Sequence, residues 1–208
     1  AAYNRPVHFC HISRKQEIEL IAQAKAQGLP VTCEVAPHHL FLNEADAKRL
    51  GPLGDMRPLL GTPEDVEALW AHINTTVDCI ATDHAPHTLA EKASDSPPPG
   101  IVGLETSLPL MLTAMENGRL SLNRLIQLMH TNPRRIFNLP KQPDTHVEVE
   151  MTPTTIQNEK LFTKVGWTPF DGVEVVGQVK RVILRGQTVF QDGKLIAQPG
   201  SGIVIPKS

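Results

Sequence analysis

Three apolar, strand-like runs of this chain end in side chains that can bind a metal ion or transfer a proton. The clearest leads into residues 81–87 (ATDHAPH), which carry one carboxylate and two imidazoles. The other two lead into Cys10-His11 and into residues 34–39 (EVAPHH). Charged groups that leave an apolar run are normally paired, metal-bound or catalytic. Three strand ends of this kind predict one shared site, and therefore an enzyme.

Imidazole and carboxylate side chains together are typical of zinc-type centres that catalyse hydrolysis. A bound metal of this kind lowers the pKa of water and polarises a carbonyl group, and a nearby aspartate can carry the proton to a leaving nitrogen. The candidates at the strand ends are His11, Glu34 or the pair His38 and His39, and Asp83. A core histidine and a helix N-cap remain the structural alternatives for His11 and Asp83. The predicted chemistry is metal-assisted hydrolysis.

The segments that must position these groups alternate between strand and helix patterns. A capping box at residues 13–16 (SRKQ) predicts a helix that ends at 28–30 (GLP), and residues 62–65 (TPED) predict the start of another. The strands are expected at residues 7–12, 31–36 and 77–82. Buried strands that alternate with helices pair in parallel and bring their C-terminal ends to one edge, where α/β barrels carry their active sites. Only three such units are recognisable, whereas a closed barrel needs eight.

In the later part of the chain, the spacing of the apolar residues changes. Helical patterns follow one another at residues 105–117, 121–130 and 132–137. Short strands are expected from about residue 147, within 175–179, 181–184, 188–190 and 195–196, and residues 150–165 are expected to form an excursion loop. Gly186 and Asp192-Gly193 supply turns between these strands. We therefore expect an α/β body over residues 1–146 and a small β-module over residues 147–208.

The bulk composition excludes several classes of protein. The 208 residues include 20 Lys and Arg against 22 Asp and Glu, so no basic field favours nucleic acid or a membrane surface. No apolar run reaches the length of a membrane span, and no signal-like segment opens the chain. The odd count of three cysteines predicts a reducing, cytoplasmic setting. Because the first residue is not Met, we expect the chain to be part of a longer one.

Several motifs together resemble the dihydroorotase family. They are the strand that ends in Cys10-His11, the CEVAPHH run at 33–39, the DHAPH run at 83–87, the PPPGIVGLET segment at 97–106 and NPRRIF at 132–137. The likeness covers essentially the whole chain and is greatest to dihydroorotase domains of multifunctional pyrimidine-synthesis proteins of the CAD type. It implies a metal-dependent amidohydrolase that interconverts N-carbamoyl-L-aspartate and dihydroorotate. The implied fold is a (β/α)8 barrel with a small β-domain, of which this chain would be the C-terminal part.

The resemblance implies a binuclear zinc site, with a third ion possible. Matched by order, residues 7–12, 30–36 and 77–83 correspond to barrel strands 6, 7 and 8, so His11 becomes a zinc ligand and Asp83 a zinc ligand and the catalytic acid–base. Cys10, Glu34 and His39 are candidates for an additional metal or for orienting a ligand. The remaining family ligands, a His-x-His, a carboxylated Lys and a further His, would precede Ala1. The chain by itself is therefore expected to be inactive.

Four residues are expected to bind the substrate. His87 and Arg57 are placed to hold its carboxylate, since a guanidinium can grip a carboxylate through two hydrogen bonds. Pro99 and Gly103 lie in a loop that can close over the ring and offer backbone groups. A loop-stabilising imidazole and an ordinary surface ion pair are the alternatives for His87 and Arg57. Four further histidines (His8, His72, His130 and His146) are expected to be structural, as are Cys33 and Cys79, which are expected to be small buried apolar residues.

The resemblance also implies partners. We expect fusion to carbamoyl-phosphate synthetase and aspartate transcarbamoylase domains, assembly into a homo-oligomer, and no nucleic-acid or membrane partner. Two alternatives to an active dihydroorotase stay open. One is a dihydropyrimidinase-like amidohydrolase, and the other is a catalytically inactive, structural dihydroorotase-like module.

Overall fold

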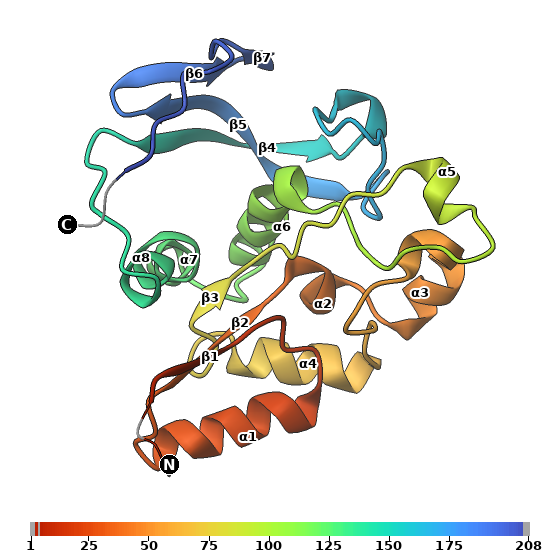
Figure 1. Ribbon diagram of the computed structural model, residues 1–208, viewed down its shortest axis with the longest axis vertical. Coiled ribbons are helices and arrows are strands. Elements are labelled where there is room, and N and C mark those ends of the chain that lie inside the picture. Colours follow the sequence, from red (N-terminus) through yellow and green to blue (C-terminus); the bar gives the residue numbers. More distant parts are fainter. Residues whose placement is uncertain (1–2, 4, 206–208) are drawn as a thin grey trace.

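The computed structural model describes residues 3 and 5–205, which form two β-sheets joined by helices (Figure 1). The first sheet has three parallel strands in the order β1 (Val7–Phe9), β2 (Val31–Val35) and β3 (Cys79–Ile80). The second sheet has four antiparallel strands in chain order, β4 (His146–Thr155), β5 (Glu174–Leu184), β6 (Gln187–Gln191) and β7 (Lys194–Leu195). The expected α/β class, with a C-terminal β-module, is confirmed.

The parallel strands are shorter than the apolar runs that predict them. His11 and Asp83 follow strands β1 and β3 with positive φ angles of 39° and 47°, values that no extended strand adopts. The ladder therefore ends before these residues, and the expected strand limits of 12, 36 and 82 are wrong at their C-terminal ends. The same turns expose the predicted site residues at the edge of the sheet.

Helices α1 (Lys15–Ala26) and α4 (Pro63–His72) pack against each other and cover one face of the parallel sheet (Figure 1). The predicted start of α4 at Thr62-Pro63 is confirmed, but the capping box of α1 lies one residue later than predicted. The carboxylate of Glu17 accepts hydrogen bonds from the backbone N–H groups of Ser13 and Arg14, at 3.0 and 2.9 Å. A glutamate at the third helical position serves both N–H groups, so Arg14 rather than Ser13 becomes the N-cap.

The remaining helices are short, except α6. Between β2 and α4 lie α2 (Pro37–Phe41), α3 (Glu44–Leu50) and the 3-10 turn η1 (Gly51–Gly54). After β3 come α5 (Leu89–Lys92), α6 (Leu104–Glu116), α7 (Leu122–Ile126), the π-helical turn η2 (Gln127–Thr131) and α8 (Asn132–Ile136), and a 3-10 turn η3 (Asn158–Lys160) follows β4. The helices predicted after residue 104 are confirmed.

The second sheet corrects two expectations. Residues 150–155 were expected in a loop but continue strand β4, because Val149 and Glu150 pair with β5 and the ladder resumes at Pro153 after a bulge. The two short strands expected over 175–184 form the single strand β5. The hairpin turn at Asp192-Gly193 is confirmed, since both residues have the positive φ angles of a type I′ turn.

Helix α6 connects the two sheets, with β5 on one side and α2 and α7 on another (Figure 1). A Cβ atom on Gly177 of β5 would lie 2.6 Å from Cδ1 of Leu112, so only glycine permits this close approach. The Thr113 hydroxyl of α6 also accepts a hydrogen bond from the Val176 backbone N–H, at 2.8 Å. The small sheet is therefore anchored directly on the α/β part.

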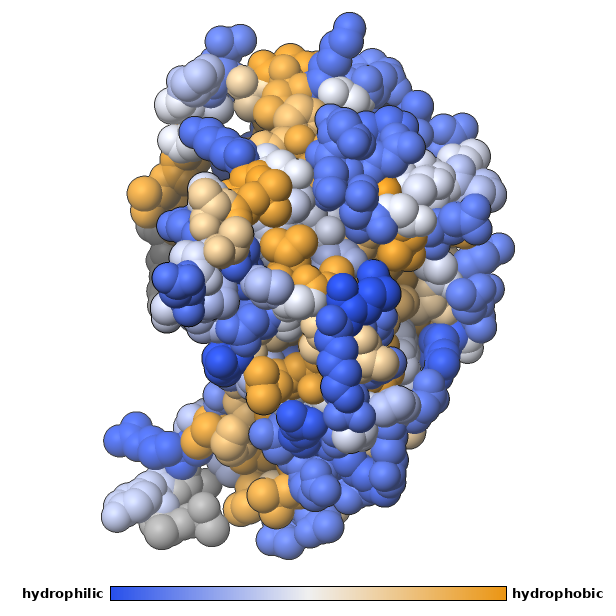
Figure 2. Space-filling model, turned by 90° about the vertical axis from the view of Figure 1, so that its right-hand side faces the viewer, coloured by the Kyte–Doolittle hydropathy of each residue, from blue (hydrophilic) through white to orange (hydrophobic). Residues whose placement is uncertain are grey.

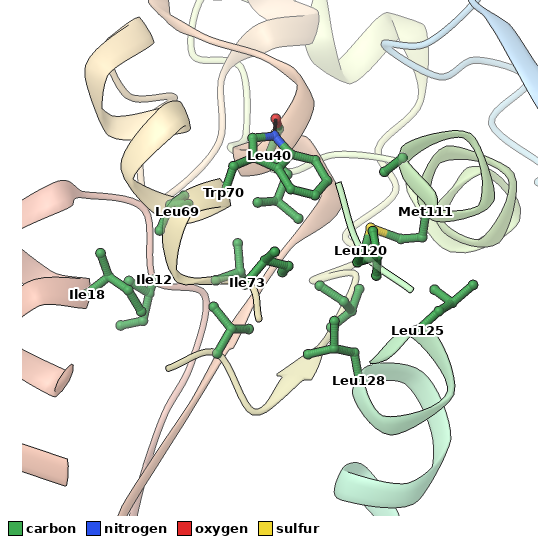
Figure 3. Close-up of a cluster of buried hydrophobic side chains, with 14 of the residues drawn as sticks. Ile12, Ile18, Leu40, Leu69, Trp70, Ile73, Met111, Leu120, Leu125 and Leu128 are labelled. Carbon is green, nitrogen blue, oxygen red and sulfur yellow. Dashed lines mark hydrogen bonds between the residues drawn. The ribbon is translucent and has the colours of Figure 1, made fainter. Parts of the chain in front are cut away.

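The main core lies between the parallel sheet and its helices (Figure 3). It includes Ile12, Ile18, Leu40, Leu69, Trp70, Ile73, Met111, Leu120, Leu125 and Leu128. A second cluster, with Met56, Ile101 and Phe170 among its members, packs beneath the loops at the end of the strands. The face turned to the viewer in Figure 2 is mostly hydrophilic and carries separate apolar patches. Among the described residues, no helix combines the length and the apolar character that crossing a bilayer requires.

Helix α7 offers a matched test of this core. Leu125 is 4% exposed and Leu122, one turn away, is 56% exposed. We expect Leu125→Ala to lower the free energy of unfolding by about 2–5 kcal/mol, because it removes buried methyl groups and leaves a cavity. Leu122→Ala should change it by less than about 0.5 kcal/mol. Urea denaturation of both variants measures the difference, and equal losses would contradict the packing described.

Candidate functional site

One face of the parallel sheet gathers polar side chains. His8 pairs with Thr32 and Glu34 pairs with Cys79 in the strand register, and side chains two residues apart share a face. The His8 ring therefore lies between Thr32 Oγ1, 2.8 Å from its Nδ1, and Glu34 Oε2, 2.9 Å from its Nε2. Cys33 points the other way and is fully buried in the main core. The sheet thus separates an apolar face under α1 and α4 from a polar face that carries His8, Glu34 and Cys79.

The ligand atoms of His8, Glu34 and Cys79 lie within 4.8 Å of one another. An imidazole, a carboxylate and a thiolate form a donor set that suits zinc. Burial, followed by the charge of Glu34, raises the pKa of Cys79 to about 12, so this thiol keeps its proton near neutral pH unless a cation displaces it. His8 and Cys79 are both expected to be structural, and the geometry adds them to the groups that could hold a metal ion.

The strand ends add further groups beside this face. Partial burial raises the pKa of the Cys10 thiol, and the carboxylates of Glu34 and Asp83 raise it further. These groups follow or end β1, β2 and β3, and the parallel pairing of these strands places their C-terminal ends side by side. Cys10, Glu34 and Asp83 therefore lie in one region of the structure, with Asp83 exposed to solvent.

His11, His38 and His39 form a second, imidazole-rich group. Burial and, to a smaller extent, the imidazole of His11 lower the pKa of His38 to about 4. Burial, followed by the imidazoles of His38 and His11, lowers the pKa of His39 to about 2. His39 is 1% exposed, and neither of its ring nitrogens has a hydrogen-bond partner among the described residues. Buried polar atoms without partners are costly, and a water molecule or a cation would satisfy these two. The residues present therefore fit a metal site at this edge of the sheet, although His11 lies outside the group formed by His8, Glu34 and Cys79.

Arg57 occupies the turn after η1 and is exposed. Its guanidinium pairs with the Asp55 carboxylate and donates a hydrogen bond to the Met56 carbonyl, at 2.8 Å. The ion-pair alternative considered for Arg57 is thus present in this structure. An incoming carboxylate would meet a guanidinium already oriented by Asp55.

The loop after β3 folds back on itself beside this turn. Gly100 donates its backbone N–H to the Asp55 carbonyl at 3.0 Å, and a Cβ atom on Gly100 would lie 3.0 Å from the His87 ring. Gly103 donates its N–H to Nδ1 of His84 at 3.2 Å, so that nitrogen carries no proton. The segments that contain Arg57, His87, Pro99 and Gly103 therefore converge. No role is predicted for His84 from the sequence, because its contact with Gly103 depends on the path of the folded loop.

The fold of the chain is that of the C-terminal part of a (β/α)8-type barrel followed by a small β-sheet. Solved structures of amidohydrolases have the same arrangement. An L-hydantoinase (dihydropyrimidinase) from Arthrobacter aurescens superposes with a TM-score of 0.88 and is 28% identical, covering 95% of this chain and 47% of its own. The inactive dihydroorotase-like domain of a CAD-like multifunctional protein from Chaetomium thermophilum superposes with a TM-score of 0.77 and is 34% identical, covering 100% of this chain and 56% of its own.

Comparison with curated proteins shows which relatives are similar to this chain in sequence. Multifunctional protein pyr1-3 of Dictyostelium discoideum is 55% identical over 203 residues, which are 97% of this chain and 9% of that protein. The dihydroorotase of Pyrococcus furiosus is 36% identical over 212 residues, or 99% of this chain and 50% of that enzyme. No family model matches the chain. The chain is therefore dihydroorotase-like, as its motifs predict, and spans about half the length of the single-function relative.

The buried imidazoles predict a dependence of stability on pH. His38 and His39 are neutral in the folded state, whereas the unfolded chain binds protons at both below their usual pKa of 6.5. The unfolded state therefore binds more protons between pH 6.5 and about 4, and stability must fall as the pH is lowered through this window. Each histidine contributes up to about 1.4 kcal/mol per pH unit.

Urea denaturation at pH 7, 6 and 5 tests this dependence. His39→Phe should reduce the slope by about 1 kcal/mol per pH unit, because the phenyl ring cannot bind a proton. His130→Phe, at an exposed position, should leave the slope as it is. If both variants keep the parent slope, His39 is not the buried neutral imidazole described.

Proposed function

We propose that this chain is the C-terminal part of a zinc-dependent dihydroorotase, which reversibly cyclises N-carbamoyl-L-aspartate to dihydroorotate in pyrimidine biosynthesis. The observation that carries the proposal is the convergence of Cys10, Glu34 and Asp83 from three parallel strand ends. The 36% identity to a dihydroorotase over 99% of the chain supports the choice of substrate. The metal ligands that precede this segment in the family would complete the site.

In this proposal, Asp83 is the residue that moves the proton. A bound zinc would lower the pKa of water and polarise the ring carbonyl. The exposed carboxylate of Asp83, at the C-terminal end of β3, accepts the proton of the attacking water and passes it to the amide nitrogen of the ring as the bond to carbon breaks. The reverse sequence closes the ring. His11 is a proposed zinc ligand, and Cys10, Glu34 and His39 are proposed to hold an additional ion or to orient the ligands.

The substrate is proposed to bind on the loop side of the strand ends. Arg57 and His87 hold the carboxylate, while Pro99 and Gly103 present main-chain groups to the ring. The pairing of Arg57 with Asp55 supports this role, since it fixes the guanidinium before the substrate arrives. Gly100 packs against His87 and allows the loop to approach closely.

The proposal extends to the whole protein. Residues 1–146 belong to the barrel and residues 147–208 to the small β-domain. The likeness to pyr1-3, which is described as a multifunctional protein, supports fusion to further domains. We propose that these are carbamoyl-phosphate synthetase and aspartate transcarbamoylase domains and that the whole protein is a cytoplasmic homo-oligomer. We propose that each complete domain binds two or three zinc ions.

Two other functions have specific support. The fold similarity to an L-hydantoinase favours a dihydropyrimidinase-like activity on rings without a carboxylate. The 34% identity to an inactive dihydroorotase-like domain favours a structural module without turnover. Assay of the full-length protein with dihydroorotate, dihydrouracil and hydantoin separates these possibilities from the proposed one.

Asp83→Asn in the full-length protein tests the proton carrier. Asparagine tolerates the positive φ of 47° at this position, so the turn should be preserved. We expect turnover to fall by at least about a hundredfold, because the amide cannot accept the proton, while zinc content measured by mass spectrometry stays largely unchanged. Asp95→Asn, in an exposed loop, is the control and should retain activity. Retained turnover in Asp83→Asn would reject the assignment.

Arg57→Met tests the carboxylate subsite. We expect KM for dihydroorotate to rise about tenfold or more while kcat changes little, since a charge-assisted hydrogen bond to the substrate is lost. Turnover of dihydrouracil, which lacks the carboxylate, should not respond. Arg49→Met is the matched control, because Arg49 also forms an ion pair with a nearby aspartate but lies on α3. An unchanged KM would assign Arg57 to a surface ion pair only.

A further inference from the structure

Lys92, the last residue of helix α5, is buried to an unusual degree for a lysine. It is 1% exposed, although lysine is almost never fully buried without partners. Its position is fixed by the capping of this short helix: Thr88 accepts the Glu91 N–H, and the Glu91 carboxylate accepts the Thr88 N–H. A buried ammonium is costly, so the contacts that it makes must offset the cost.

Both side-chain hydrogen bonds of Lys92 go to main-chain carbonyls. Its Nζ donates to the Asp55 carbonyl at 2.9 Å and to the Pro98 carbonyl at 3.0 Å. The Asp55 carbonyl also accepts the Gly100 N–H, at 3.0 Å. Lys92 therefore bridges two segments far apart in sequence, the turn that carries Arg57 and the loop that carries Pro99.

The ring of Trp167 provides a third contact to the Lys92 ammonium. The Lys92 ammonium lies 5.8 Å from the centroid of the Trp167 ring, within the range of a cation–π contact. The indole N–H of Trp167 donates to the His87 carbonyl at 2.7 Å, and the ring is 2% exposed. The cover over the ammonium is therefore tied to the segment that carries His87.

The charges around Lys92 also connect it to the carboxylate subsite. Burial lowers the pKa of Lys92, Asp55 raises it and Arg57 lowers it. The ammonium and the guanidinium of Arg57 thus share the Asp55 residue, the first through its carbonyl and the second through its carboxylate. A movement of Asp55 would displace the guanidinium as well.

We propose that Lys92 is a positioning residue of the substrate site, which holds the Asp55–Arg57 turn and the 97–100 loop at a fixed separation so that Arg57 and Pro99 can grip the substrate together. The proposal rests on the proposed function for its substrate, and on the contacts of Lys92 for its geometry. Lys92 does not touch the substrate. It acts through the two carbonyls, so its loss affects binding before it affects the chemical step.

Lys92→Met in the full-length protein is the test, with Lys48→Met, at an exposed position on α3, as the matched control. Methionine keeps an unbranched chain but cannot donate to the carbonyls. We expect KM for dihydroorotate to rise about tenfold while kcat stays within about threefold. Hydrogen–deuterium exchange should increase in the segments around residues 55–57 and 100–102, and remain as in the parent in strands β5 and β6.

A second variant releases Trp167 from the His87 segment without changing the lysine. Trp167→Phe keeps a ring but loses the hydrogen bond to the His87 carbonyl, so exchange should increase around residues 87–89 and much less around 55–57. This variant keeps the proposal testable if Lys92→Met folds poorly.

The outcomes separate the two proposals. If the parent protein has no turnover of dihydroorotate or N-carbamoyl-L-aspartate, the proposed function fails, and the exchange pattern alone decides the role of Lys92. Local exchange together with a selective rise in KM supports the positioning role. Unchanged exchange, an unchanged KM, or a uniform rise in exchange across the chain with equal losses in kcat and kcat/KM would overturn it.

Discussion

The alternation of side chains along strand β2 is the constraint on which the site depends. Cys33 and Val35 are fully buried in the main core, so the residues between and beside them must face the other way. A shift of one residue in the register would bury Glu34 in the core and expose the apolar side chains. The hydrophobic packing of α1 and α4 on one face therefore fixes the position of His8, Glu34 and Cys79 on the other.

The loops beyond the strands are held by a different kind of interaction, in which side chains donate to main-chain carbonyls. Lys92 donates to Asp55 and Pro98, Trp167 to His87, and Thr168 to Val102 at 3.2 Å. A carbonyl inside a loop has no ladder to join, and it must find a donor when it is buried. Donors from outside the loop fix its path while its own side chains stay free to meet a ligand.

The sequence predicted what local patterns determine. Apolar runs that alternate with helical stripes predicted the parallel sheet, and Asp192-Gly193 predicted a hairpin because its type of turn needs two positive φ angles. The grouping of Cys10, Glu34 and Asp83 followed from the rule that parallel strands end at one edge. Strand β4 was missed over residues 150–155, because its polar side chains carry little apolar signal and its pairing depends on β5.

The contributions of His8, Cys79 and Lys92 could not be predicted because they arise from register and from contacts between distant segments. His8 reads as one polar residue inside a short strand until Thr32 and Glu34 are placed beside it. Lys92 reads as the basic end of a short helix. Its burial depends on Asp55, Pro98 and Trp167, which lie between 6 and 75 residues away in the sequence.

The small β-sheet contributes to the site through its longest connection. The segment between β4 and β5 carries Trp167 and Thr168, which donate to the His87 and Val102 carbonyls of the loop after β3. Its other end is fixed where the Glu105 carboxylate of α6 accepts the N–H groups of Phe162 and Thr163, at 2.8 and 2.9 Å. Because β5 is anchored on α6 through Gly177 and Val176, this connection cannot move independently of the barrel part. The β-sheet is therefore a support that links helix α6 to the loops at the strand ends.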